Sequence, residues 1–195
     1  MSTSTTTSST AQPIPGRAAL LQFRVTPSKQ TNHQTAKAHI VEAAENGAQL
    51  VVLPEIWNGP YATAAFGEYA ETLPSVGYSY EDTVVNENIK EEAPSAELLF
   101  RLAKEYGIYI VGGSVPERVV EFDSESESET TKLYNTCLCI DPSGTLVAKH
   151  RKVHLFDIDI PGQITFRESD TLSPGDSATW FDAGDGFGRI GIGIW

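Results

Sequence analysis

Short apolar runs that alternate with helix-like segments constrain the fold of this chain most strongly. Three such runs cover residues 18–25, 49–54 and 108–113, and their length and β-branched content are typical of buried strands. Segments with a helical spacing of apolar residues lie between them, at 31–47 and 94–107. Strands separated by helices pair in parallel through right-handed crossovers, so helices should cover the sheet. The pattern therefore predicts an α/β fold.

Local signals define the ends of both predicted helices. In the first helix, Thr31 followed by Gln34 fits a capping box, and Gly47 supplies a C-terminal stop. In the second, Pro94 suits the first helical position, and Gly107 ends the helix.

The second half of the chain has a different, hairpin-like pattern. Alternating segments at 132–140 and 145–153 flank Asp-Pro-Ser-Gly at 141–144, which is a type I turn sequence, so an antiparallel hairpin is expected. Two further strands are expected at 178–183 and 188–194. The predicted sheet is therefore mixed.

Length and charge limit the number of domains and the classes of partner. The 195 residues suit one domain, expected over 17–195, after a disordered Ser/Thr-rich tail at 1–16. Like charges and few hydrophobic residues predict a solvated, mobile acidic loop at about 121–131. The net charge of −12 argues against nucleic acid and anionic lipid as partners. No apolar run approaches the roughly 20 residues needed to cross a bilayer.

The two cysteines bear on the cellular compartment. Cys137 and Cys139 stand two residues apart in an alternating segment, which places both thiols on one strand face, where neighbours rarely form a disulfide. The segment before Arg17 lacks the arginines of a mitochondrial presequence and the apolar core of a secretory signal. We expect a reducing compartment, the cytoplasm, with the mitochondrion as the alternative.

Two charged residues stand at the ends of predicted strands. Glu55 directly follows the run at 49–54, and ligands of open α/β sheets bind at the carboxyl ends of strands. A carboxylate partly desolvated there could act as a general base, or it could cap a helix or form an ion pair. Lys152 ends the strand at 145–153, where it could stabilise an oxyanion or activate a nucleophile, or lie on the surface.

The histidines suggest no metal site. His150 and His154 are separated by four residues of strand, or about 13 Å. Zinc requires each ligand within about 2 Å of one ion, so this pair cannot share it. We expect both histidines to be structural and no metal to be bound.

Three stretches of the sequence resemble motifs of a known family. They are LPEIWNGPY at 53–61, HRKVHLFDIDIPGQITFRESDTLSPGD at 150–176 and GRIGIGI at 188–194. Together they resemble consecutive motifs of the carbon-nitrogen hydrolase (nitrilase) superfamily, and the middle stretch is most similar to its ω-amidase branch. The resemblance covers about residues 18–194, apart from apparent insertions around 75–92 and 121–131.

The resemblance implies a fold and a set of site residues. The fold would be the N-terminal portion of an α-β-β-α sandwich that carries a Glu-Lys-Cys catalytic set with a second glutamate. By this resemblance, Glu55 matches the general base, Lys152 the lysine that stabilises the tetrahedral intermediate, and Glu168 the supporting glutamate. The nucleophilic cysteine would follow the run at 188–194, but that position holds Trp195.

Two polar residues in family-like contexts could line the pocket. Tyr61 lies in NGPY and could bind substrate, and Asn135 lies in LYNT. Structural roles are the alternative for both. The two cysteines at 137 and 139 lie mid-strand, where a thiol usually packs as a small hydrophobe, so they are not expected to replace the nucleophile.

The resemblance also implies a function. It is hydrolysis of small dicarboxylate monoamides, such as α-ketoglutaramate, to the acid and ammonia through a cysteine thioester, in glutamine and asparagine metabolism. The resemblance implies no cofactor, and the complete enzyme is expected to be a homo-oligomer. Because the nucleophile position holds Trp195, we expect an incomplete domain that is inactive by itself. The alternatives are a non-catalytic subunit that pairs with full-length relatives and a hydrolase that uses other residues.

Overall fold

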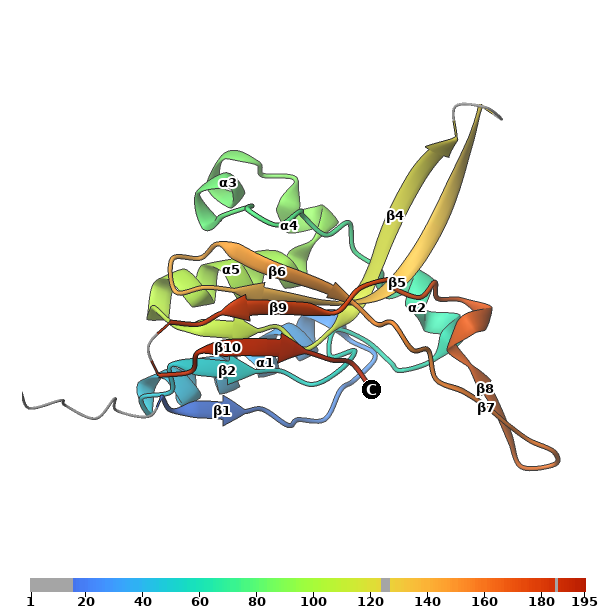
Figure 1. Ribbon diagram of the computed structural model, residues 1–195, viewed down its shortest axis with the longest axis horizontal. Helices are drawn as coiled ribbons and strands as arrows, with labels where there is room; N and C mark the ends of the chain where they lie inside the picture. Colours follow the sequence, from blue (N-terminus) through green and yellow to red (C-terminus); the bar gives the residue numbers. More distant parts are fainter. Residues whose placement is uncertain (1–15, 124–126, 185) are drawn as a thin grey trace, which may run out of the picture.

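The computed structural model describes residues 16–123, 127–184 and 186–195. The predicted tail at 1–16 therefore lies outside the described residues, except for Gly16. The described chain forms a central sheet with helices on one side and a small second sheet on the other (Figure 1).

The central sheet has six strands of mixed direction. Three strands pair in parallel, as the alternation with helices predicted: β1 (Ala18–Leu20), β2 (Leu50–Val52) and β3 (Tyr109–Val111). Three more pair antiparallel: β4 (Val115–Asp123), β5 (Ser128–Ile140) and β6 (Leu146–Arg151). β5 joins the two groups because it pairs with β3 as well as with β4 and β6. The predicted α/β class and mixed sheet are confirmed.

Two long helices cover one face of this sheet (Figure 1). They are α1 (Lys29–Glu45) and α5 (Pro94–Tyr106). In α5, Pro94 occupies the first turn, and Gly107 caps the C-terminus with a φ of 62° in the left-handed region, as predicted. The apolar side of α5 packs against the sheet. Its buried side chains include Leu98, Leu99, Phe100, Leu102 and Ala103.

The start of α1 differs from the prediction. Ser28, and not Thr31, is the N-cap, and its side-chain oxygen accepts the Thr31 N–H at 3.2 Å. Both hydroxyl residues fit a capping position, and the chain uses the earlier one. The predicted stop is confirmed, because Gly47 has a φ of 82° and its N–H donates to the Ala44 carbonyl at 2.9 Å.

Shorter helices lie in two connecting segments. Between β2 and α5 the chain forms α2 (Thr63–Tyr69), α3 (Tyr80–Val85) and α4 (Ile89–Glu92), and a 3₁₀ turn occupies Glu168–Asp170. Among the residues described, none of the helices has the length and apolarity that a membrane span requires.

The other face of the central sheet is covered by two strands. β9 (Thr179–Asp182) and β10 (Arg189–Ile192) pair antiparallel and lie over it (Figure 1). Their apolar side chains pack on those of the central sheet, including Val111 and Cys139. The arrangement gives the helix, sheet and sheet layers of the predicted sandwich.

Two hairpins project from this body (Figure 1). β4 and β5 form a long arm, and their pairing runs from Val115 and Thr136 in the body to Asp123 and Ser128 at the far end. The segment at 121–131 was predicted as an acidic loop, but its residues 121–123 and 128–131 form paired strands joined through a turn at Glu127; residues 124–126 lie outside the described residues. The second hairpin consists of β7 (Asp157–Ile160) and β8 (Ile164–Arg167).

The predicted turn between β5 and β6 is also confirmed. The Gly144 N–H donates to the Asp141 carbonyl at 2.9 Å, and the Asp141 carboxylate accepts the N–H of Ser143, also at 2.9 Å. Gly144 has a φ of 80°. The turn fixes the register between β5 and β6, which places Arg151 opposite Thr136 at the end of β6, directly before Lys152.

Candidate active site

Glu55 lies just beyond the carboxyl end of β2, where the chain bends sharply. The next residue, Ile56, is buried and has a φ of 46°, which is strained for a β-branched residue. Its N–H donates to the Ser114 hydroxyl at 3.0 Å, and the Ser114 N–H donates to the Pro54 carbonyl at 3.2 Å. These two hydrogen bonds join the segments that follow β2 and β3, and they hold the backbone next to Glu55 in position.

A glycine allows this close approach. Gly113 has a φ of 59°, and a Cβ atom at this position would collide with the Pro54 carbonyl oxygen. Only glycine both tolerates this φ and leaves the space empty. The Gly-Gly sequence at the end of β3 therefore supports the position of Glu55.

Lys152 directly follows β6 and is completely buried. Its N–H donates to the Asn135 carbonyl and its carbonyl accepts the Gly175 N–H, both at 2.8 Å, so its backbone is held on both sides. The ammonium nitrogen lies 3.0 Å from Glu55 Oε1 and 3.0 Å from Glu168 Oε2. This buried cation therefore joins two carboxylates from distant parts of the chain.

Glu168 follows the β7–β8 hairpin and has no exposed surface. Its Oε2 accepts the N–H of Phe156 at 2.6 Å, and its Oε1 accepts hydrogen bonds from Lys152 at 3.1 Å and from the Tyr61 hydroxyl. A buried carboxylate requires such donors, because burying it without them would be costly. The base of the hairpin is thereby tied to Lys152.

Tyr61 and Asn135 both contact Glu55. The Asn135 amide donates to Glu55 Oε1 at 2.8 Å, and the Tyr61 hydroxyl lies 3.2 Å from the same oxygen. Burial, helped by the hydrogen bond to Glu168 and by the two negative charges, raises the pKa of Tyr61 well above its usual value. The phenol therefore stays protonated and acts as a donor.

The cluster suits acid–base chemistry on a bound molecule. Two carboxylates face one ammonium, so one carboxylate charge is not neutralised by an ion pair within the cluster. The Glu168 side chain is completely buried, whereas 29% of the surface of the Glu55 side chain is exposed. Glu55 is thus the carboxylate that can exchange a proton with a ligand, and Lys152 can place positive charge beside it.

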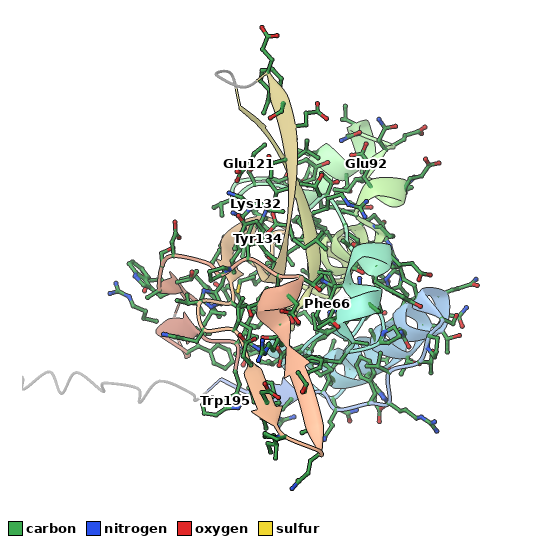
Figure 2. All side chains as sticks on the ribbon, turned by 90° about the vertical axis from the view of Figure 1, so that its right-hand side faces the viewer. Phe66, Glu92, Glu121, Lys132, Tyr134 and Trp195 are labelled. Carbon is green, nitrogen blue, oxygen red and sulfur yellow. The ribbon has the colours of Figure 1, made fainter. Side chains whose placement is uncertain are left out.

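Trp195 borders the same cavity as Glu55. The cavity has a volume of about 140 Å³, and Gly113, Ser114 and Cys137 also line it. The Trp195 side chain is 95% exposed and lies at the end of the chain (Figure 2). The structure therefore places position 195 at the cavity that holds the Glu55 side chain.

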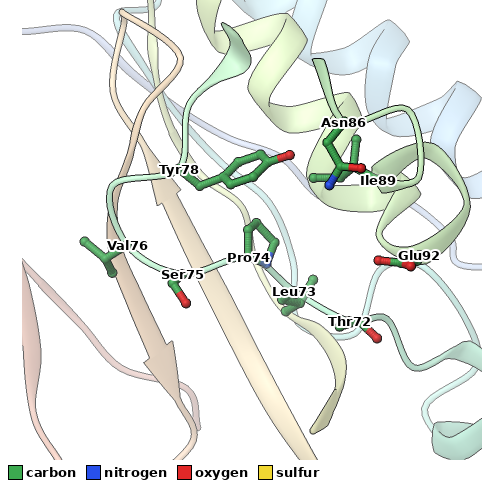
Figure 3. Close-up of a pocket in the computed structure, with 9 residues that line it drawn as sticks. All are labelled: Thr72, Leu73, Pro74, Ser75, Val76, Tyr78, Asn86, Ile89 and Glu92. Atoms are coloured by element: carbon green, nitrogen blue, oxygen red, sulfur yellow. The ribbon is translucent and has the colours of Figure 1, made fainter. Parts of the chain in front are cut away.

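A second hollow, of about 360 Å³, is separate from this cluster. It is lined by residues in the segment 72–92, including Tyr78 and Glu92 (Figure 3). It contains neither Glu55 nor Lys152, so the chemistry of the cluster does not extend to it.

The two histidines that follow the β5–β6 hairpin turn differ in their surroundings. His150 is buried, its Nδ1 lies 2.9 Å from the Thr179 hydroxyl, and burial lowers its pKa. His154 is exposed. In the described parts of the chain, no group of three or more His, Cys, Asp or Glu side chains could hold a metal.

Both cysteines are free and buried in the sheet. A hydrogen bond with Cys137, together with burial, raises the pKa of the Cys139 thiol. A protonated, buried thiol is a poor nucleophile. Cys137 nevertheless lines the Glu55 cavity, which its position in mid-strand did not predict.

Sequence reasoning missed three residues in or beside the site. Ser114 was not identified, although it is the polar residue next to the Gly-Gly end of β3 and that position could have revealed it. The N–H of Phe156 was missed because a backbone donor leaves no trace in side-chain identity. Buried Glu117, ion-paired with Lys149 and Arg151 beside the site, was also missed.

Comparison with known proteins decides the family. The family model for carbon-nitrogen hydrolases matches residues 17–194. The chain belongs to the carbon-nitrogen hydrolase family. It is 46% identical over 178 residues to Omega-amidase NIT2-B of Xenopus laevis, and 44% identical over 178 residues to Omega-amidase NIT2 of Homo sapiens. Each match covers 91% of this chain and 54% of the relative, so the chain spans about half the length of these relatives.

Solved structures agree with this assignment. The crystal structure of Saccharomyces cerevisiae Nit3, a member of branch 10 of the nitrilase superfamily, matches with a TM-score of 0.62 and 34% sequence identity. The match covers 87% of this chain and 51% of that chain. The carbon-nitrogen hydrolase fold of the described layers is thus supported by sequence and by structure.

Proposed function

We propose that this chain carries the general base and the oxyanion-stabilising lysine of an ω-amidase site. The single observation that supports this most strongly is the position of Lys152, fully buried and 3.0 Å from both Glu55 and Glu168. The similarity to relatives named Omega-amidase supports the reaction type.

In the proposed reaction, a thiol attacks the carbonyl carbon of an amide and ammonia leaves. Glu55 accepts the thiol proton and passes it to the departing nitrogen, and Lys152 stabilises the negative oxygen of the tetrahedral intermediate. Glu168 and Tyr61 hold the ammonium in place through their contacts with Lys152, at 3.1 and 3.4 Å. Water activated by Glu55 then hydrolyses the thioester.

The Glu-Lys-Cys set lacks its nucleophilic sulfur atom in this chain. Position 195, where the resemblance places the cysteine, carries an indole, which cannot form a thioester. We therefore propose that this chain by itself does not turn over amides. A thiol at position 195 would lie at the cavity that Glu55 lines.

The test is ammonia release from α-ketoglutaramate by three proteins. We expect none from the chain itself, measurable release from W195C, and a loss of about 100-fold or more when Glu55→Gln is added to W195C. Release by the unchanged chain would show that other residues perform the reaction. A W195C variant that folds but releases no ammonia would count against the assignment of Glu55 and Lys152.

Substrate, partners and compartment are part of the same proposal. The substrate would be a small dicarboxylate monoamide, no cofactor is required, and the complete enzyme would be a homo-oligomer located in the cytoplasm, with the mitochondrion as the alternative. A non-catalytic subunit that pairs with full-length relatives stays a prediction. Co-purification with such a relative would test it.

A further inference from the structure

The outer edge of the β4–β5 arm is open along its distal part. Near the body, the edge of β4 is covered, because Glu71 donates to the Pro116 carbonyl at 2.9 Å and accepts the Arg118 N–H at 2.8 Å. The same alternation directs the backbone groups of Val120 and Phe122 outward. In the described part of the chain, no backbone hydrogen bond reaches these outward groups.

Apolar side chains accompany this open edge. Val120 is 54% exposed and Phe122 is 66% exposed, and the two residues lie on the same face of the arm because side chains alternate along a strand. Two apolar side chains beside unpaired backbone groups form a template on which another strand can pair.

Carboxylates lie on both faces of the arm, and Glu121 is on the face opposite Val120 and Phe122. The Glu121 carboxylate is 2.7 Å from the ammonium of Lys132 (Figure 2). Glu129 pairs directly with Phe122 across the arm, so its exposed carboxylate lies on the same face as Val120 and Phe122, and Glu127 at the tip is exposed as well. An added strand would therefore meet valine and phenylalanine on one face, Glu121 on the other, and further carboxylates toward the tip of the arm.

We propose that the edge of β4 around Val120 and Phe122 binds an extended, basic segment of another protein by strand addition. The segment alternates apolar residues, which pack beside Val120 and Phe122, with lysine or arginine, which faces Glu121. Main-chain hydrogen bonds supply affinity and the alternating side chains supply specificity.

Charge favours a basic segment over a second copy of this chain as the binding partner of the β4 edge. Two β4 edges that paired with each other would bring their Glu121 carboxylates together, and each chain carries a net charge of −12. Like charges across an interface oppose association, whereas a basic segment is attracted to the arm. The arm is also separate from the Glu55 cluster, so this inference does not depend on the proposed function.

The probe is an eight-residue peptide of alternating valine and lysine, with a valine–glutamate peptide as the comparison. Fluorescence anisotropy should show that the chain binds the lysine peptide at least ten times more tightly, and less tightly as salt is raised. V120P removes an outward N–H without removing a β4–β5 ladder bond, and it should weaken binding at least tenfold. V85S alters an 86%-exposed valine on α3 and should change nothing.

Three outcomes would overturn the proposal. The first is equal binding of the two peptides. The second is a V120P variant that unfolds at the wild-type urea midpoint and still binds the lysine peptide as tightly as the wild-type chain does. The third is concentration-dependent dimerisation in analytical ultracentrifugation that V120P abolishes, because the edge would then bind a second copy. A variant with Glu121→Gln provides the charge test, since it should lose affinity for the lysine peptide and keep its fold.

Discussion

Replacing Lys152 by methionine should destabilise the fold strongly, although the two side chains have similar length. The ammonium is fully buried between Glu55 and Glu168, and Glu168 itself has no exposed surface. Methionine fills most of the space but leaves the Glu168 carboxylate without its cation. The change therefore tests the charge balance of the cluster rather than its packing.

The expected loss follows from the geometry. At 3.0 Å and an effective dielectric constant of about 20, each ion pair contributes about 5 kcal/mol of gross attraction, most of which offsets the cost of burying the charges. Removing one partner of a buried pair typically costs about 3–5 kcal/mol, because the remaining charge is left unpaired. For a chain of this size this corresponds to a fall in Tm of about 6 to 20 °C.

Urea unfolding of four proteins measures this effect: the wild type, K152M, E168Q and the double variant. The double variant should be more stable than K152M, because removing the unpaired Glu168 charge relieves the penalty. A K152M variant that loses less than about 1 kcal/mol, or a double variant that loses the sum of both single changes, would refute a buried ion-paired cluster.

Three further predictions concern the surroundings of the cluster. Gly113→Ala should cost about 1–3 kcal/mol in urea unfolding and more than Gly162→Ala, since both glycines have positive φ but only the first lacks room for a Cβ; equal losses would contradict the tight approach. Burial alone would raise the pKa of Glu117, but hydrogen bonds and charges from the cations around it hold it below its usual value of 4.5. The pKa of Glu117 is therefore higher in the unfolded chain than in the native chain, so on acidification the unfolded chain takes up this proton first. The free energy of unfolding that Glu117 contributes above about pH 4.5 is lost as the pH falls below that value, and Glu117→Gln should flatten this pH dependence. Cys137 and Cys139, which are 2% and 0% exposed, should resist a thiol reagent in the native chain and react once it is unfolded; fast labelling of the native chain would contradict their burial.

Local signals predicted the elements that depend on neighbours in sequence. Pro94 and Gly107 define α5 because a missing N–H and a left-handed φ act within one turn. The same logic left two choices at the start of α1, where Ser28 and Thr31 both offer a hydroxyl. Sequence could not decide between them, because the choice depends on where the chain leaves the preceding loop.

The arm was missed because pairing between strands overrides local composition. The glutamates and serines at 121–131 indicated a loop, yet the ladder of β4 and β5 continues through residues 121–123 and 128–131 of this segment. A regular register over nine residue pairs supplies hydrogen bonds that an isolated acidic segment cannot.

The candidate site was partly accessible from sequence. Positions at strand ends indicated Glu55 and Lys152, and the family resemblance added Glu168. The structure brings these three together, but the supporting contacts of Ser114 and Phe156 come from segments far apart in the chain. Such contacts depend on the tertiary fold, which no local pattern encodes.

The most direct test of the central claim measures the reactivity of a thiol placed at position 195. W195C is alkylated with iodoacetamide at pH 7, with and without Glu55→Gln, and Val85→Cys serves as an exposed control. If Glu55 acts as a base toward position 195, W195C should react faster than the control, and Glu55→Gln should slow it by about 100-fold. Equal rates for all three folded proteins would contradict the claim that this cluster is arranged to activate a nucleophile there.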